Sequence, residues 1–366
     1  MKTPSSAEPS APDISLAAPA SEAYSHRGLT YPLGRDGPGI GEVVPIVEGL
    51  GWARLPVPGS LKHINIWLLD DGEGVAIVDT GLDIPPCREA WEALLDGPLA
   101  GRPVTRVFVT HFHPDHIGLA GWLARRFAVP LWISREEWLF ARMLTADVRD
   151  EPPPEAFTYW RAAGWDEKRI KAEAAKGWGR FASVVTPIPA SFIRMRDGDE
   201  LAIGCGRWRV VTGNGHCPEH VCLVDEDRGL LIAGDQVLPR ITSNVSLSLS
   251  EPEADPLGDW LSSIAKLKKL PQDLLVLPSH GEPFIGLHAR LDALDAGHRD
   301  RLDALHVHLA EPRRAVDCFG ILFGRAIDDG IIGLATGEAF AHLRHLEVEG
   351  RARREIRDLV HWYGAA

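Results

Sequence analysis

The stretch T-H-F-H-P-D-H-I-G-L-A-G-W, residues 110–122, places three histidines and an aspartate within six consecutive positions. An apolar run from Val104 to Thr110 leads into this cluster and is typical of a β-strand. Apolar residues then recur at helical spacing as far as Phe127, which predicts a helix. The cluster therefore lies where a strand ends and a helix begins, the position at which α/β folds place their reactive groups.

The spacing inside the cluster suits metal binding. His111 and His113 are two residues apart on extended backbone, so their rings face the same side. Asp115 and His116 follow as the chain turns, and they can face a neighbouring point. One short stretch could thus hold two metal ions. The alternative is a chance group of histidines on a polar loop, and the H-x-H-x-D-H spacing makes this the weaker interpretation.

Two ions need more ligands than this stretch supplies, because a zinc-type ion takes about four. Three candidates stand elsewhere: His216 in T-G-N-G-H-C-P-E-H, Asp235 in L-L-I-A-G-D-Q-V-L and His280 in L-L-V-L-P-S-H-G-E-P. Each follows an apolar strand, as His111 does. We therefore expect all of them to converge at one end of a sheet sandwich.

The pattern along the 366 residues predicts one sizeable domain and a smaller unit. Residues 1–25, rich in Pro, Ser and Ala, predict a disordered tail. Residues 26–287 alternate strand and helix patterns and form the main domain, interrupted at 134–190 by a polar helical insertion or lid. Residues 288–366 are mostly helical. Four tryptophans of the insertion could line an apolar substrate pocket or, as the favoured interpretation, pack it onto the main domain: Trp138, Trp160, Trp165 and Trp178.

The composition argues against several classes of partner. With 39 basic and 51 acidic residues the formal net charge is -12, so nucleic acid is not an expected partner. No apolar run reaches the ~20 residues of a membrane span, and no signal-peptide pattern opens the sequence. The five cysteines are scattered without a C-x-x-C pair, which suits a reducing, cytoplasmic setting.

Five short motifs occur in register: V-D-T-G at 78–81, H-x-H-x-D-H at 111–116, T-G-x-G-H-x-P-E-H at 212–220, A-G-D at 233–235 and P-S-H-G at 278–281. Together they resemble the metallo-β-lactamase-fold hydrolase superfamily, and its glyoxalase II-like branch more than the lactamases of bacterial resistance. The resemblance implies an α/β fold, a four-layer αββα sandwich, for the main domain. The tail resembles the small winged-helix domain of lactamase-like hydrolases and ribonucleases.

The resemblance also implies roles for individual residues. One metal ion is implied at His111, His113 and His216, and a second at Asp115, His116 and His280, with Asp235 bridging them. Asp79 is implied to fix the surrounding loops. The ions are expected to be zinc, with iron or manganese as alternatives. The residues assigned to catalysis are Asp115, Asp235 and His220.

Several other residues have two interpretations each. His220 hydrogen-bonds a ligand or caps a turn, and Cys217 is a soft competitor for metal or, preferably, a small buried residue. His63, Arg240 and Asn244 are candidate substrate contacts, the last two for an anionic group, against ordinary structural or surface roles. The tail histidines are expected on a solvated helix face: His288, His298, His306 and His308.

The leading functional hypothesis is a dinuclear metal-dependent hydrolase that uses a metal-bridging hydroxide on a small-molecule thioester, ester or lactone. A ribonuclease and a mononuclear iron persulfide dioxygenase are the enzymatic alternatives. A non-catalytic module with a structural metal is a third class, which the mixed His and Asp ligands disfavour. The oligomeric state is open, with a homodimer as one option.

Overall fold

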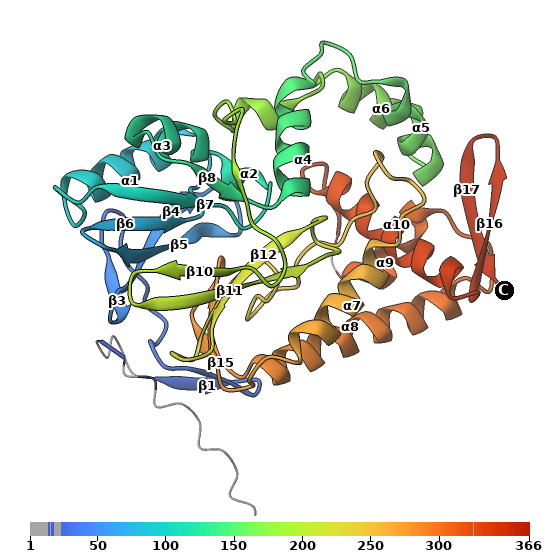
Figure 1. The fold of residues 1–366 in the computed structure, drawn as a ribbon. Helices are drawn as coiled ribbons and strands as arrows, with labels where there is room; N and C mark the ends of the chain where they lie inside the picture. The colour runs from blue at the N-terminus through green and yellow to red at the C-terminus, as the bar shows by residue number, and fades with distance from the viewer. Residues whose placement is uncertain (1–13, 15, 18–22, 325) are drawn as a thin grey trace, which may run out of the picture.

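In the described part of the chain, two large β-sheets pack face to face and helices cover both outer sides (Figure 1). This is a computed structural model that describes residues 14, 16–17, 23–324 and 326–366. The predicted tail therefore lies mostly outside the described residues, and its last two residues, Tyr24 and Ser25, belong to a strand.

The first sheet has the order β3-β4-β5-β6-β7-β8-β9. Its strands are antiparallel from β3 to β6 and parallel from β6 to β9. Their bounds are Val44–Val47 (β3), Leu50–Val57 (β4), Lys62–Asp71 (β5), Gly74–Val78 (β6), Val104–Phe108 (β7), Leu131–Ile133 (β8) and Ile193–Arg194 (β9).

The second sheet has the order β1-β2-β15-β14-β13-β12-β11-β10. All neighbours in it are antiparallel except β13 and β14. The bounds are Tyr24–His26 (β1), Leu29–Tyr31 (β2), Glu200–Ile203 (β10), Gly206–Gly213 (β11), His220–Asp225 (β12), Leu230–Gly234 (β13), Leu275–Pro278 (β14) and Phe284–Ile285 (β15).

Alternating side chains of the strands form three apolar cores, which define four layers. Trp67 of β5 and Trp208 of β11 lie in the core between the sheets. Ile66, on the other face of β5, packs beneath helices α1 (Pro85–Asp96) and α3 (Ala120–Phe127). Helices α7 (Pro256–Leu267) and α8 (Leu287–His308) cover the second sheet. This arrangement confirms the predicted four-layer αββα fold.

The segment between β8 and β9 is helical and includes α4 (Arg135–Ala146), α5 (Pro154–Ala163), α6 (Glu167–Ala174) and the 3-10 helix η1 (Arg180–Ser183). The tryptophans of this segment pack against neighbouring side chains and do not line the metal pocket described below. Trp160 stacks on Trp165, and the Trp165 indole donates a hydrogen bond to Thr336 Oγ1 at 3.0 Å. Trp138 stacks on Phe192. The favoured packing role of the tryptophans therefore holds.

The C-terminal region consists of helices followed by a β-hairpin at the end of the molecule opposite β3 (Figure 1). After α8 come η2 (Ala315–Cys318), α9 (Phe319–Phe323), α10 (Ile332–Val348), β16 (Ala352–Arg357) and β17 (Val360–Ala365). The first half of α8 packs on the second sheet and the rest joins α10, so one apolar core runs through both regions.

One prediction for this tail is wrong. His298 is fully buried instead of solvated, because α10 packs across it and places His342 Nε2 3.3 Å from His298 Nδ1. Helical spacing alone placed His298 among charged neighbours and gave no sign of the second helix.

Two further observations concern the whole described chain. None of its helices is long and apolar enough to cross a lipid bilayer. All five cysteines lie in the described residues and none forms a disulfide.

Candidate metal centre

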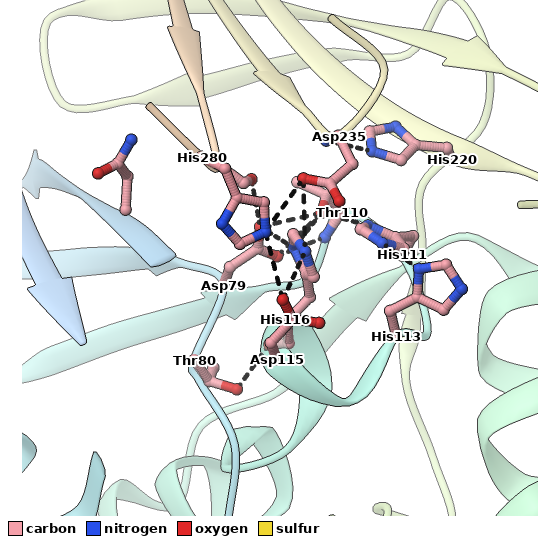
Figure 2. A network of polar contacts seen from close by, with 12 residues as sticks. Asp79, Thr80, Thr110, His111, His113, Asp115, His116, His220, Asp235 and His280 are labelled. Atoms are coloured by element: carbon pink, nitrogen blue, oxygen red, sulfur yellow. Dashed lines mark hydrogen bonds and ion pairs between the residues drawn. The ribbon is translucent and has the colours of Figure 1, made fainter. Parts of the chain in front are cut away.

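The loop after β7 carries the histidine cluster to the edge where the two sheets open (Figure 2). Helix α2 (Pro114–Ile117) begins directly after His113, because a proline at the first helical position needs no hydrogen-bond partner for its nitrogen. This turn separates His111 and His113 from Asp115 and His116. The remaining predicted ligands follow the ends of β11, β13 and β14 at the same edge: His216, Asp235 and His280.

His111, His113 and His216 form a first group of ligand atoms. His111 Nε2 lies 2.9 Å from His113 Nδ1 and 3.3 Å from His216 Nε2. Zinc–nitrogen bonds of about 2.0–2.1 Å in a tetrahedral site would separate neighbouring ligand atoms by about 3.4 Å. The three nitrogens are therefore spaced as the ligands of one ion would be.

Asp115, His116 and His280 form a second group. His280 Nε2 lies 3.2 Å from Asp115 Oδ2, and His116 Nε2 lies 3.8 Å from the same oxygen. Asp235 Oδ1 completes this group at 3.6 Å from both imidazole nitrogens. The other oxygen of Asp235, Oδ2, lies 3.6 Å from His216 Nε2 in the first group. The two oxygens of one carboxylate thus face the two groups.

The ligand atoms of the second group fit a cation. His116 Nε2, His280 Nε2 and Asp235 Oδ1 are buried and make no hydrogen bond in the described structure. A buried polar atom left without a partner costs about 1–3 kcal/mol, so three that face one point indicate a ligand between them. A cation also removes the repulsion between imidazole lone pairs and carboxylate oxygens. The donor set of imidazoles and carboxylates suits zinc, iron or manganese.

Backbone carbonyls orient two of the imidazoles. His216 Nδ1 donates to the carbonyl of Asn244 at 2.7 Å, and His280 Nδ1 donates to the carbonyl of His63 at 2.9 Å. Each bond assigns the proton to Nδ1 and leaves Nε2 free to ligate, an arrangement usual for metal-bound histidine. His63 and Asn244 therefore support ligands through their main chains.

Asp79 anchors the cluster from beneath. Its Oδ1 accepts a hydrogen bond from the Thr110 amide at 2.8 Å, and its Oδ2 accepts one from His116 Nδ1 at 2.8 Å. The residue is buried and has a φ of 64°, a left-handed conformation that Asp tolerates better than most residues. Asp79 thereby fixes both the start of the loop and the ring of one ligand.

His220 is placed differently from the catalytic role predicted for it. The ring is buried, and its Nε2 accepts a hydrogen bond from the backbone amide of Asp235 at 3.0 Å. Burial, and after it the neighbouring His216, lowers the pKa of His220 well below its ordinary value, so the ring is neutral. Because the amide occupies Nε2, His220 positions the carboxylate and does not exchange protons with a substrate.

Electrostatics divides the ligands into two classes. Burial lowers the pKa of His113 to about 3, and it also lowers that of His216, which keeps both rings neutral as metal ligands must be. Burial also disfavours charge on His116 and His280, but the surrounding carboxylates outweigh it and raise both pKa values. For Asp115 burial favours the neutral acid, but the neighbouring His116 and His280 outweigh it and lower the pKa to about 2. The second group therefore attracts positive charge.

A pocket of about 480 Å³ opens in front of the first group. His113, His216, Cys217 and Asn244 form its floor. Cys217 is buried, with Sγ 3.8 Å from His113 Nε2, so both interpretations of this residue remain open. Among the described residues that line the pocket, charge comes from carboxylates and from no Lys or Arg: Glu136, Glu251 and Asp259.

Two of the three predicted substrate contacts do not line this pocket. Arg240 binds Glu282 through Nε at 2.8 Å and through a second nitrogen at 2.9 Å, so its charge is already paired. His63 is half-buried, and burial lowers its pKa to about 4. Asn244 lines the pocket, but its side-chain amide donates to Glu338 at 3.0 Å. The expected binding of an anionic group by Arg240 has no support.

Glu137 is a residue that the sequence did not single out. It is buried at the start of α4, and its two oxygens accept hydrogen bonds from the amides of Phe112 at 2.8 Å and Glu219 at 2.7 Å. These amides belong to the two loops that carry His111 and His216, so one carboxyl group ties the loops together. In S-R-E-E-W the residue resembles any exposed helical carboxylate, so the sequence held no signal for it.

Known proteins share this arrangement. The family model described as the metallo-beta-lactamase superfamily matches residues 59–280, and that of a metallo-beta-lactamase-like C-terminal domain matches residues 302–366. A beta-lactamase domain protein from Burkholderia ambifaria, known from its crystal structure, is 39% identical in sequence. The comparison covers 92% of this chain and 98% of that one, with a TM-score of 0.85.

Two curated relatives are more distant. The atrochrysone carboxyl ACP thioesterase of Emericella nidulans is 24% identical over 311 residues, which cover 83% of this chain and 80% of that protein. A human acyl-coenzyme A thioesterase is 24% identical over 200 residues, 52% of this chain and 64% of that protein. Since the first family model covers more than half of the chain and the Burkholderia protein matches nearly all of it, this protein belongs to the metallo-beta-lactamase superfamily.

Proposed function

We propose that this protein is a dinuclear metal-dependent thioesterase that hydrolyses small-molecule thioesters. The observation that carries the proposal is the position of Asp235, whose two oxygens face two separate groups of ligand atoms. The first ion would be held by His111, His113 and His216, and the second by Asp115, His116 and His280. Zinc is the proposed metal, with iron and manganese as alternatives.

The chain's own residues prepare the site for hydrolysis. Bound cations would supply an acidified water and a polarised carbonyl oxygen. Asp79 and the carbonyls of Asn244 and His63 hold the imidazoles in fixed tautomers, while His220 holds Asp235 by its amide. The pocket admits substrate from the side of His113. Asp235, which faces both groups, and Asp115 of the second group are the residues best placed to accept a proton from water.

The bond class rests on the relatives and on the ligand set. Two relatives are named as thioesterases, one of which aligns with most of this chain. Retention of an aspartate at position 235 favours esters and thioesters over lactams, which also supports a place near the glyoxalase II-like branch. A helix followed by a hairpin at residues 332–366 supports a winged-helix assignment for the C-terminal region.

A ribonuclease activity is not favoured. The pocket in front of the metal groups carries carboxylates and, among its described lining residues, no Lys or Arg. Polyanionic nucleic acid depends on cationic side chains for most of its affinity. We therefore expect no RNA binding in a gel shift at low salt.

Hydrolysis of acyl thioesters, followed by detection of the released thiol, tests the proposal. We expect activity that chelation abolishes and that added zinc, iron or manganese restores, together with two metal equivalents by elemental analysis. The Asp70→Asn variant changes an exposed residue near the end of β5 and serves as a control that should retain activity. Activity on esters or lactones but on no thioester would overturn the bond class. A single tightly bound iron with sulfur-dioxygenase activity would favour the persulfide alternative.

A further inference from the structure

A second cavity, of about 270 Å³, lies beside the metal pocket. Its walls come from helix α5, residues 247–252, helix α10 and the β16–β17 hairpin. Tyr159, Leu247 and Leu249 line both this cavity and the metal pocket, so the two hollows share a wall. In Figure 1 the insertion helices and the hairpin stand on either side of α10, at the end of the molecule where the cavity lies.

The cavity has an apolar interior. Pro154, Thr158 and Ala162 recur at helical spacing and present one face of α5. Phe340 of α10 and Tyr363 of β17 line the opposite side, and both are almost fully buried. Such a lining binds ligands through apolar contact rather than through hydrogen bonds.

The shared wall is fixed in place. The Tyr159 hydroxyl donates a hydrogen bond to the carbonyl of Leu247 at 2.8 Å. This bond satisfies the polar atom of the tyrosine and links the insertion to the loop that follows the metal ligands. An acyl chain that runs from the metal pocket into the cavity would therefore lie against the tyrosine ring and the side chains of Leu247 and Leu249, which line both hollows.

Both arginines at the cavity already have carboxylate partners, and the remaining acidic lining residue, Glu155, is exposed. Arg354 contacts both oxygens of Glu253 at 2.9 Å, and Arg344 binds Glu347 at 2.8 Å. A phosphate would have to displace these carboxylates before it could use either arginine. The cavity therefore suits an uncharged group.

We propose that this cavity, hereafter the acyl cavity, holds the acyl chain of the thioester whose carbonyl lies at the metal centre. The inference rests on the proposed thioesterase function and adds the substrate class, namely thioesters of apolar chains longer than acetyl. Each methylene that the cavity removes from water is expected to raise kcat/KM about fourfold, up to the length that fills it. The thiol part of the substrate remains in the metal pocket.

Two variants narrow the acyl cavity from different sides. Ala162→Phe fills it from the buried face of α5, and Thr158→Trp obstructs it from an exposed position. Leu144→Phe is the matched control, because Leu144 lines a different cavity of about 200 Å³ on the same insertion. Kinetics use acetyl to dodecanoyl thioesters of N-acetylcysteamine, so that only the chain changes.

We expect kcat/KM of the unaltered protein to rise with chain length. In both narrowed variants the ratio of kcat/KM for dodecanoyl over acetyl thioester should fall at least about tenfold, and in Leu144→Phe it should stay at the original value. An unchanged ratio in Ala162→Phe and Thr158→Trp would overturn the acyl cavity while leaving the thioesterase function intact. Absence of thioester hydrolysis in the unaltered protein would overturn the function instead. Binding of an uncharged fluorescent long-chain alcohol to the metal-free protein measures the cavity independently of catalysis, and failure to bind it also contradicts the inference.

Discussion

Replacement of Asp79 by Asn tests whether the metal site depends on a residue that does not ligate metal. The left-handed backbone at Asp79, with φ of 64°, suits Asn as well as Asp. The change therefore removes a charge without straining the main chain. The introduced side chain has a single oxygen for two donors, the Thr110 amide and the His116 ring. In the unaltered protein these donors bind different oxygens of the Asp79 carboxylate.

The expected cost follows from these two contacts. Whichever way the introduced side-chain amide turns, its NH₂ group faces a donor, so one hydrogen bond to a charged acceptor is lost, worth about 1.5–3 kcal/mol. If this free-energy cost is expressed mainly as increased mobility of the His116 ring, the affinity of the second group for its metal ion should fall about 10- to 100-fold. Neither His113 nor His216 of the first group contacts Asp79. The ion of the first group should therefore be retained at chelator concentrations that already remove the ion of the second group.

Competition for added metal between the metal-free protein and a chromophoric chelator measures the affinities of both groups of ligands for their ions. Asp70→Asn supplies the control, because Asp70 is more than half exposed and lies away from the centre. We expect Asp79→Asn to lose one of two metal equivalents first, with the other close to the unaltered protein. Two unchanged affinities in a folded Asp79→Asn protein would refute the positioning role of this carboxylate.

Four further substitutions have defined outcomes. Asp235→Asn should halve the metal content and lower thioester hydrolysis at least about a hundredfold, as measured by elemental analysis and kinetics; normal activity would contradict a bridging ligand. Burial raises the pKa of Glu137 from 4.5 to about 8, so its contribution to stability is present at low pH and is lost as pH rises through this window. Denaturant unfolding of the metal-free proteins should therefore show that the stability of the unaltered protein relative to Glu137→Gln falls by about 2–4 kcal/mol between pH 5 and 8; an identical pH dependence of the two proteins would contradict it. Gly118→Ala would place a methyl group 2.4 Å from the Gly81 carbonyl and should destabilise the fold by about 1–3 kcal/mol. Gly297→Ala, which meets no atom in helix α8, should stabilise it by about 0.5–1 kcal/mol in thermal unfolding.

The parts of the site that the sequence predicted are those encoded by local spacing. His111 and His113 lie two apart on extended chain, and Asp235 and His280 each follow an apolar strand. β7 belongs to the first sheet and β13 and β14 to the second, and the packing of the two sheets brings these strand ends to a common edge, so the residues converge although more than 100 positions separate them. The resemblance of the five motifs implied the four-layer fold, and strands such as β5 account for it physically because their apolar side chains lie on both faces.

The roles that could not be predicted depend on partners far away in sequence. His220 and Arg240 each had the residue type for a chemical role, but an amide of Asp235 and the carboxylate of Glu282 already occupy them. Glu137 had no distinguishing pattern, yet its burial beneath two loops gives it a structural function. Residue type limits what a side chain can do, and the tertiary contact decides what it does.

The same division explains where specificity is built in this protein. The proposed metal ligands come from strand ends of the sandwich, within the residues 59–280 that the superfamily model matches, so we expect them to define a reaction and not a substrate. The acyl cavity is enclosed by α5, α10 and the hairpin, which meet only in the folded chain. None of Ala162, Leu247 and Phe340 carries reactive chemistry, and each is typical of an ordinary apolar core. Substrate choice in this arrangement can therefore change through apolar substitutions in the insertion and the C-terminal region while every metal ligand stays in place.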